Sequence, residues 1–447
     1  MSKQRPNILY IHSHDTGQFI EPYGYKVDTP NLQRLAEEGV MFRNSFTPNP
    51  TCSPSRACLL TGQYPHNNGM LGLAHRGFSL YDYEHHLIHT LKRQGYSAYL
   101  SGVQHIANMH EVPWQTIGYD ESLDESHKES HTKAAQFLNN APEQPFFLSV
   151  GFFETHRGGN SKEEFVHDPE IPAPDPKYVI PPPPLADTPE TRQDMALFLQ
   201  SAATLDRKMG VVFDALKESG LAENTLVICT TDHGIAFPRM KCNLEDSGTK
   251  VMLIMKDSRE FSGGKVVEGM VNNIDIFPSL CDYLDIDPPD WLDGRSFMPL
   301  VREELEQTND AIFFEINYHA AYEPLRAVRT KRWKYIRRLD PQTHPILPNC
   351  DASLSKTQWL EARWNNTTPP EEALYDLILD ANEKKNLVDD PQFGDVVNEM
   401  RQRLDEWMRT SHDPLAETGD VPLVETTVCN PRDGVHPDEA LLPTGTR

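Results

Sequence analysis

Three apolar runs, each about the length of one buried strand, occur along the first half of the chain. They occupy residues 7–11, 146–153 and 225–230. Apolar runs of about four to eight residues are typical of strands that are covered on both faces. Each run leads directly into polar residues, which occupy positions 12–17, 154–157 and 231–234. Because open α/β sheets build their sites at the carboxyl ends of their strands, we expect these three polar segments to meet at one site.

Helical patterns lie between the apolar runs. Residues 29–31, Thr-Pro-Asn, are expected to begin one helix. Residues 187–190, Asp-Thr-Pro-Glu, resemble a capping box with proline in the first turn, and they predict the start of a long helix towards Leu216. Residues 277–284 predict a further short helix. The segment 168–184 is crowded with proline and has no apolar period, which predicts a surface loop.

The pattern changes from about residue 311. Antiparallel strands are expected at residues 311–316, 325–336 (with a turn at 330–331) and 373–377. An amphipathic helix is expected at residues 393–408, before an irregular tail. The chain is therefore predicted to contain two domains. Residues 1–310 form an α/β domain that carries the site, and residues 311–447 form a smaller α+β domain.

Composition narrows the classes of function. The formal net charge of −24 argues against non-specific nucleic-acid binding, which needs a basic surface. No window approaches the roughly 18 uninterrupted apolar residues of a membrane span. The seven cysteines are scattered and odd in number, unlike a disulfide framework. Because the chain opens without an apolar signal-peptide core, we expect a cytoplasmic protein, and a periplasmic one only if a leader has been removed.

Two His/Asp pairs follow predicted buried strands. His14 and Asp15 follow the first strand, and Asp232 and His233 follow the third. Two carboxylates and two imidazoles make a competent four-ligand set for one divalent ion. The alternative is that each pair is made of turn residues that cap the next element.

A cysteine motif gives the sequence its most specific signal. Cys52 begins the run Cys-Ser-Pro-Ser-Arg-Ala, which continues into Leu-Thr-Gly at residues 60–62. This run resembles the signature of the type I sulfatases of the alkaline phosphatase superfamily. In that family the cysteine is oxidised by a formylglycine-generating enzyme to formylglycine, whose hydrated aldehyde is the nucleophile. The plain alternative is that Cys52 is a small buried apolar residue.

The resemblance implies a fold and an activity. The expected fold is the alkaline-phosphatase-like sulfatase fold, in the α/β class. It has a large mixed sheet sandwiched by helices, and a small C-terminal antiparallel sheet-and-helix domain. The expected reaction is hydrolysis of a sulfuric ester or a sulfamate. The resemblance implies that a hydroxyl of the modified Cys52 binds the metal together with His14, Asp15, Asp232 and His233.

Further roles are implied residue by residue. Arg56 is the signature arginine, expected to anchor the modified cysteine. His105 is expected to take a proton from it, and His156 to contact sulfate or to protonate the leaving group. Lys241 matches the family's second catalytic cation. The lysine that usually precedes the family's equivalent of His105 is replaced by Val103, so another cation is needed near the sulfate.

The metal ligands also depart from the family pattern. The first family pair is usually Asp-Asp, and His14 stands in place of the first aspartate. Ca²⁺, the family default, prefers an all-oxygen shell. Imidazole nitrogens favour Mn²⁺, Fe²⁺ or Zn²⁺. We therefore expect one divalent ion, Ca²⁺, Mn²⁺ or Zn²⁺, with Ca²⁺ in doubt.

The flanking motifs are similar to those of the sulfamidase branch. They include Asn-Gly-Met at 68–70, Phe153 with His156 and Arg157, and Ala-Arg-Trp at 362–364. Sulfamidases cleave the N–S bond of N-sulfoglucosamine in heparan sulfate. The expected substrate is accordingly a small sulfated saccharide or another sulfate ester. Arg157, His75 and Arg76 are expected to bind it, and residues 74–78 differ enough from sulfamidases to build a different subsite.

Two other functions remain open at this point. The first is a phosphonate monoester or phosphodiester hydrolase, because such relatives also use formylglycine and often have Asp-His metal ligands. The second is a catalytically inactive protein that binds sulfated glycans through an unmodified Cys52. The sequence leaves a homo-oligomer open.

Overall fold

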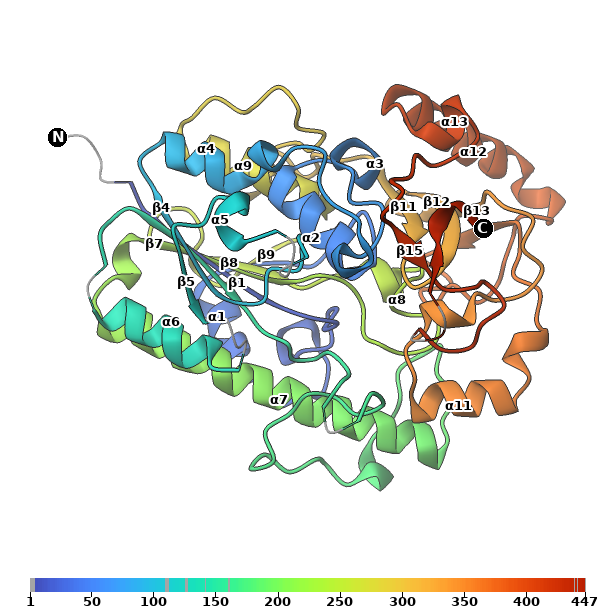
Figure 1. The fold of residues 1–447 in the computed structure, drawn as a ribbon, viewed down its shortest axis with the longest axis horizontal. Helices are drawn as coiled ribbons and strands as arrows, with labels where there is room; N and C mark the ends of the chain where they lie inside the picture. Colours follow the sequence, from blue (N-terminus) through green and yellow to red (C-terminus); the bar gives the residue numbers. More distant parts are fainter. Residues whose placement is uncertain are drawn as a thin grey trace.

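A single eight-stranded sheet forms the centre of the protein (Figure 1), whose computed structural model describes residues 5–108, 112–124, 128–140, 142–159, 161–437, 439 and 441–446. The strand order is β5-β4-β6-β1-β7-β8-β2-β9. The first five strands in this order are parallel, and β8 runs antiparallel to both of its neighbours. The predicted large mixed sheet is therefore confirmed. Its strands are β1 Asn7–Ser13, β2 Val40–Phe42, β4 Ser97–Gly102, β5 Glu121–Asp124, β6 Phe146–Gly151, β7 Thr225–Thr231, β8 Leu253–Lys256 and β9 Lys265–Val267.

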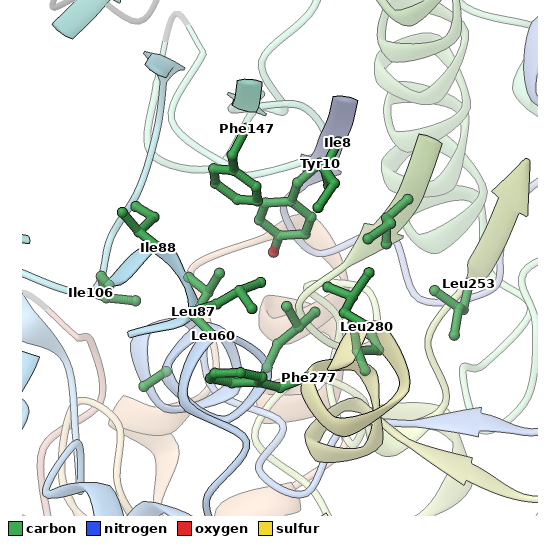
Figure 2. Packing of buried hydrophobic residues seen from close by; sticks show 14 of the residues in the cluster. Ile8, Tyr10, Leu60, Leu87, Ile88, Ile106, Phe147, Leu253, Phe277 and Leu280 are labelled. Atoms are coloured by element: carbon green, nitrogen blue, oxygen red, sulfur yellow. The ribbon is translucent and has the colours of Figure 1, made fainter. Parts of the chain in front are cut away.

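Strand β1 shows why the first apolar run has no polar alternation. Ile8 and Tyr10 enter one core cluster, whereas Leu9 and Ile11 enter another on the opposite face. Successive side chains of a strand point to opposite faces, so a strand with helices on both sides must be apolar throughout. Figure 2 shows the first cluster, in which Tyr10 packs beside Phe147 of β6.

Helices cover both faces of the sheet, above and below it in the view of Figure 1. One face is covered by α1 Pro30–Glu38, α6 Ser130–Asn139 and α7 Pro189–Glu218. The other is covered by α2 Cys52–Thr61, α4 Leu87–Arg93 and α9 Ile276–Leu284.

The long helix α7 begins where the sequence predicts, but its cap differs. The Thr188 hydroxyl accepts a hydrogen bond from the backbone N–H of Thr191 at 3.2 Å. A capping box would need an acidic residue at the position of Thr191, and Glu190 lies one residue too early. The predicted reciprocal half of the capping box is therefore wrong.

A smaller antiparallel sheet follows in the order β11-β12-β13-β14, as predicted. Its strands are Ile312–Tyr318, Tyr322–Arg329, Trp333–Arg338 and Glu372–Asp376, and helix α12 Gly394–Thr410 packs on it. Contacts cross the predicted boundary at residue 310. The Glu315 N–H donates to the Pro48 carbonyl at 2.9 Å, and the rings of Tyr64 and Trp407 lie 5.0 Å apart. The division into 1–310 and 311–447 stays a prediction.

The remaining elements are short. The proline-rich segment 168–184 forms an irregular loop with one 3-10 turn, as predicted. None of the described helices combines the length and the apolar character needed to cross a bilayer. The short helices are α3 Pro65–Asn68, α5 Trp114–Ile117, α8 Asp246–Thr249, α10 Met298–Val301, α11 Leu354–Glu361 and α13 Pro414–Glu417. The short strands are β3 Ser45–Phe46, β10 Val271–Asn272, β15 Val428–Cys429 and β16 Leu442–Pro443.

Candidate active site

The three polar segments meet at the carboxyl ends of β1, β6 and β7. Beyond the paired strands, the His14 N–H donates to the Glu154 carbonyl at 3.0 Å, and the Thr155 N–H donates to the His14 carbonyl at 2.8 Å. The Asp15 N–H donates to Asp232 Oδ1 at 2.8 Å. The backbone therefore fixes the relative positions of the side chains that the sequence marks as metal ligands.

Two overlapping groups of side chains could hold one metal ion. The groups are His14, Asp15, Cys52 and His156, and Asp15, Cys52, Asp232 and His233. Within each group the ligand atoms lie within 4.8 Å of one another. These residues are buried, except for the half-buried His156.

Two atoms of this cluster support a bound cation. His14 Nδ1 and Asp15 Oδ1 are buried and make no hydrogen bond of good geometry, and their nearest polar neighbours are other candidate ligand atoms, Asp232 Oδ2 at 3.0 Å and His233 Nε2 at 3.3 Å. Buried polar atoms nearly always have a partner, and a divalent ion would supply one for both. Burial, followed by the charge of Arg56, also lowers the pKa of His14 well below its usual range. A neutral imidazole has a free lone pair for a metal, so the residues present fit the expected ion.

Asp232 and Arg56 connect the cluster to helix α2. Arg56 Nη2 donates to Asp232 Oδ2 and to the Ser13 carbonyl, both at 2.8 Å, and Arg56 Nη1 donates to His12 Nδ1 at 2.5 Å. Burial opposes ionisation of Asp232, but His233, Arg56 and His14 hold its pKa well below the usual range. Arg56 therefore connects the end of β1 to Asp232 through hydrogen bonds. Its expected contact with a modified cysteine stays a prediction.

Cys52 is the first residue of α2, directly after its N-cap Thr51. The N-terminus of a helix favours an anion, which suits a sulfate group at this position. The thiol is 2% exposed and lies 3.4 Å from His233 Nε2. Burial raises the pKa of the Cys52 thiol far above its usual range. An unmodified Cys52 would therefore be a neutral thiol, which is a poor nucleophile.

Lys241 lies between two carboxylates. Its Nζ is 3.0 Å from Asp15 Oδ2 and 3.0 Å from Asp351 Oδ2, and 3.5 Å from His156 Nε2. Burial works against the charge, but Asp15 and Asp351 raise the pKa of Lys241 well above its usual range. The predicted catalytic cation is therefore charged and next to the predicted catalytic histidine.

His105 faces the same space from the end of β4. Its ring stacks on that of His75 at 5.5 Å. Both His105 and the metal-ligand candidate Asp15 have left-handed backbones, with φ of 55° and 48°. Such conformations are costly for residues other than glycine and concentrate at functional sites.

These side chains line one cavity of about 240 Å³. The structure brings Cys52, His75, His105, His156 and Lys241 to it, as the sequence predicts. Their catalytic or binding roles stay predictions.

Two predicted substrate-binding residues, Arg157 and Arg76, make hydrogen bonds to other parts of the protein. Arg157 Nη1 and Nη2 pair with Asp194 at 2.8 and 3.0 Å, and its guanidinium stacks over Phe165. Arg76 donates to Asn430 Oδ1 and to the Pro437 carbonyl, both at 2.7 Å. Both guanidinium groups hold segments of the cavity wall together, and both residues also line the cavity, so the substrate contacts expected of Arg157 and Arg76 stay predictions.

Sequence reasoning missed three ionisable residues among those that line the cavity, Lys162, His319 and Asp351. His319 lies in the turn between β11 and β12, and Asp351 lies in the irregular segment before α11. None of the three follows a strand of the main sheet, so the strand-end pattern could not find them. Because Val103 replaces the family lysine, the sequence predicts that another cation lies near the sulfate. Lys162, which lines the cavity, is a candidate for that cation.

Comparisons with known proteins show the family to which the chain belongs. Residues 6–286 match the family model described as Sulfatase, and residues 237–346 match that of the N-sulphoglucosamine sulphohydrolase C-terminal region. The chain is 28% identical to human N-sulphoglucosamine sulphohydrolase, over 93% of this chain and 92% of the human protein. It is 26% identical to an ulvan-active sulfatase of Formosa agariphila, over 91% of this chain and 75% of that protein.

Solved structures show the same fold. The Bacteroides fragilis protein yidJ, described as a sulfatase, superimposes with a TM-score of 0.74 at 19% identity, over 95% of this chain and 99% of that one. The family model covers well over half of the chain and includes all residues of the two groups around Cys52 that could hold a metal ion. The chain therefore belongs to the sulfatases of the alkaline phosphatase superfamily and is a sulfatase enzyme.

Proposed function

We propose that this protein releases sulfate from a small sulfated saccharide, such as N-sulfoglucosamine, by using a formylglycine made from Cys52 and one divalent metal ion. The observation that carries the proposal is the position of Cys52. It begins helix α2 and belongs to both groups of side chains that could hold an ion, one with His14, Asp15 and His156 and the other with Asp15, Asp232 and His233. Similarity to the human sulphohydrolase over nearly the whole chain supports a sulfated sugar.

Sulfatases generally use a formylglycine and a divalent ion. A formylglycine at position 52 would supply a hydrated aldehyde as the nucleophile. The bound ion would neutralise sulfuryl oxygens and lower the pKa of that nucleophile. His14, Asp15, Asp232 and His233 would hold it, and the two imidazoles favour Mn²⁺ or Zn²⁺ over Ca²⁺.

The other side chains bind the sulfate and move protons. The charged Lys241 would bind a sulfate oxygen as the S–O or S–N bond breaks. His156, 3.5 Å from Lys241, would give a proton to the leaving oxygen or nitrogen. His105 would accept the proton of the second hydroxyl of residue 52 when sulfate leaves and the aldehyde re-forms.

The first experiment asks whether residue 52 is modified. Protein made with and without a formylglycine-generating enzyme is treated with an aldehyde-specific hydrazide and digested, and the Cys52 peptide is examined by mass spectrometry. We expect hydrazide labelling and sulfate release only in the co-expressed protein. Cys52→Ala should abolish both, whereas the buried Cys281→Ala in helix α9 is a matched control that should keep both. Sulfate release by Cys52→Ala would refute the mechanism, and an unlabelled, inactive protein would favour the glycan-binding alternative.

A second candidate function is hydrolysis of phosphonate monoesters or phosphodiesters. A phosphonate monoester hydrolase of Agrobacterium radiobacter shares the fold, with a TM-score of 0.68 at 20% identity over 91% of this chain and 96% of that one. The observation that favours this candidate is the imidazole at two metal-ligand positions, His14 and His233. Turnover of N-sulfoglucosamine, an aryl sulfate and an aryl phosphonate by the same preparation separates the two functions.

A further inference from the structure

Asp351 places a carboxylate in a cavity whose other charged or titratable lining residues are mainly lysines, arginines and histidines. Asp351 is the only acidic side chain among the described residues that line the cavity of about 240 Å³. The other ionisable lining side chains are Cys52, His75, Arg76, His105, His156, Arg157, Lys162, Lys241 and His319. A site for a sulfate anion gains from cations and loses from a nearby carboxylate. Sulfate binding alone therefore does not explain why a carboxylate, which also pairs with Lys241, lines this cavity.

The segment that carries Asp351 is fixed on both sides. Before it, Asn349 Oδ1 accepts a hydrogen bond from the Ala321 N–H at 2.8 Å. Lys356 Nζ donates to the Cys350 carbonyl at 2.6 Å, and the Ser353 hydroxyl caps helix α11. The side chain of Asp351 is only 14% exposed. The carboxylate is therefore held at the cavity by the fold and does not reach it through a flexible loop.

The charge state of Asp351 follows from its neighbours. Burial alone would raise the pKa of Asp351, but Lys241, at 3.0 Å, and then His156 and His319 hold it far below its usual range. Asp351 is therefore an ionised carboxylate near neutral pH. An ionised carboxylate can only accept hydrogen bonds.

We propose that Asp351 selects substrates in which a hydroxyl or ammonium group lies beside the sulfate that is removed, and rejects those with a second sulfate or a carboxylate at that place. A donor on the sugar makes a charge-assisted hydrogen bond with Asp351. A second anionic group of the substrate at the same place is repelled by the Asp351 carboxylate, and its loss of water adds a further energetic cost. The inference rests on the proposed function, because it assigns a specificity role within the same site.

The test compares Asp351→Asn with the wild-type enzyme, both with confirmed conversion of Cys52. Three substrates are used: N-sulfoglucosamine, a set of glucosamine disulfates, and an aryl sulfate that has no neighbouring donor. We expect kcat/KM for N-sulfoglucosamine to fall about 10- to 100-fold more than kcat/KM for the aryl sulfate, as for the loss of one hydrogen bond to a charged group. We expect turnover of at least one disulfate, relative to the monosulfate, to rise in the variant.

Two further variants control the test. Asp187→Asn removes an exposed carboxylate that pairs with Arg192 at the start of α7, and it should leave all substrate ratios unchanged. Asp351→Glu keeps the charge but moves the carboxylate by one methylene, so it should keep the rejection of disulfates while weakening monosulfate turnover. This variant also serves if Asp351→Asn fails to fold.

Three outcomes would overturn the inference. A ratio of disulfate to monosulfate turnover that stays unchanged in Asp351→Asn, whatever the loss on the aryl sulfate, would show that Asp351 acts only through Lys241. A wild-type preference for a disulfate, or wild-type turnover of the aryl sulfate but of no sugar, would show that the carboxylate selects no neighbouring donor. Failure of the wild-type enzyme to hydrolyse even the aryl sulfate would instead refute the proposed function on which the inference rests.

Discussion

Arg326→Met should strongly destabilise the protein, because Arg326 is the only arginine in a buried cluster of two carboxylates and one histidine. Its side chain is fully buried on β12. Its Nε and Nη2 pair with Asp413 at 2.5 and 3.0 Å, and Nε lies 3.6 Å from Glu315 Oε2. His66 Nδ1 lies 2.5 Å from Glu315 Oε2. The cluster joins α3, β11, β12 and the N-cap of α13.

The magnitude follows from what the variant leaves behind. Methionine fills a similar volume, so the loss is mainly electrostatic. Both carboxylates would stay buried, with only His66 as a nearby cation. Removing one partner of a buried ion pair costs about 3–5 kcal/mol, because the other charge is left uncompensated. The matched control is Arg409→Met, which removes an exposed pair with Glu406 on α12. Exposed pairs contribute about 0–1 kcal/mol.

The assay is equilibrium unfolding in urea at pH 7, followed by circular dichroism and tryptophan fluorescence. We expect Arg326→Met to lower the free energy of unfolding by about 3–5 kcal/mol and Arg409→Met by less than about 1 kcal/mol. Adding Asp413→Leu to Arg326→Met should recover part of the loss, since it removes one stranded charge. A loss below about 1 kcal/mol for Arg326→Met alone would refute the reasoning.

Four more predictions follow from the same structure. Burial opposes protonation of His66, but Glu315 and Asp413 raise its pKa above the usual value of about 6.5. Protonated His66 therefore stabilises the fold below about pH 6.5, and this stabilisation is lost as the pH rises through the raised pKa. Urea unfolding across pH 5–9 should show a smaller decrease in the free energy of unfolding with rising pH for His66→Gln than for the wild-type protein. Lys241→Ala should lower kcat/KM more for a sugar sulfate than for an aryl sulfate, because Lys241 lies 3.5 Å from His156, the proposed proton donor to the leaving group. Equal losses would contradict an effect of Lys241 on the leaving group through His156. Removal of the metal ion by a chelator should abolish activity. In the wild-type protein, Mn²⁺ or Zn²⁺ should restore activity best, whereas Ca²⁺ should become more effective in His14→Asp, because that variant has one more oxygen ligand. Metal content and turnover measure both effects. Gly234→Ala should destabilise the site, because its Cβ would lie 2.0 Å from the Ser247 carbonyl oxygen, and an unchanged thermal midpoint would contradict this.

The sequence predicted the main sheet and most of the site for a physical reason. A strand covered on both faces, such as β1, must be apolar throughout, and the polar residues that follow it can only lie at the sheet edge. Residue type and position along the chain were therefore enough to place His14, Asp15, Asp232 and His233 together.

Other features depended on packing that no local pattern records. Arg157 lies next to His156 in the sequence, but its guanidinium turns to Asp194 on α7. Asp351 and His319 line the cavity although they lie in segments that follow strands of the small sheet, far along the chain from Cys52. Residue type at these positions is visible in the sequence, whereas the direction of each side chain is set by contacts between distant segments.

The burial of Cys52 has a consequence for the order of events in the cell. Cys52 is 2% exposed and lines a cavity of only about 240 Å³, which is too small to admit a second protein once the chain has folded. Any enzyme that oxidises this residue must act on the nascent or unfolded chain. Chains that fold first are trapped as thiols, and later exposure to the modifying enzyme cannot rescue them. The active fraction of a preparation is then decided by competition between maturation and folding during synthesis.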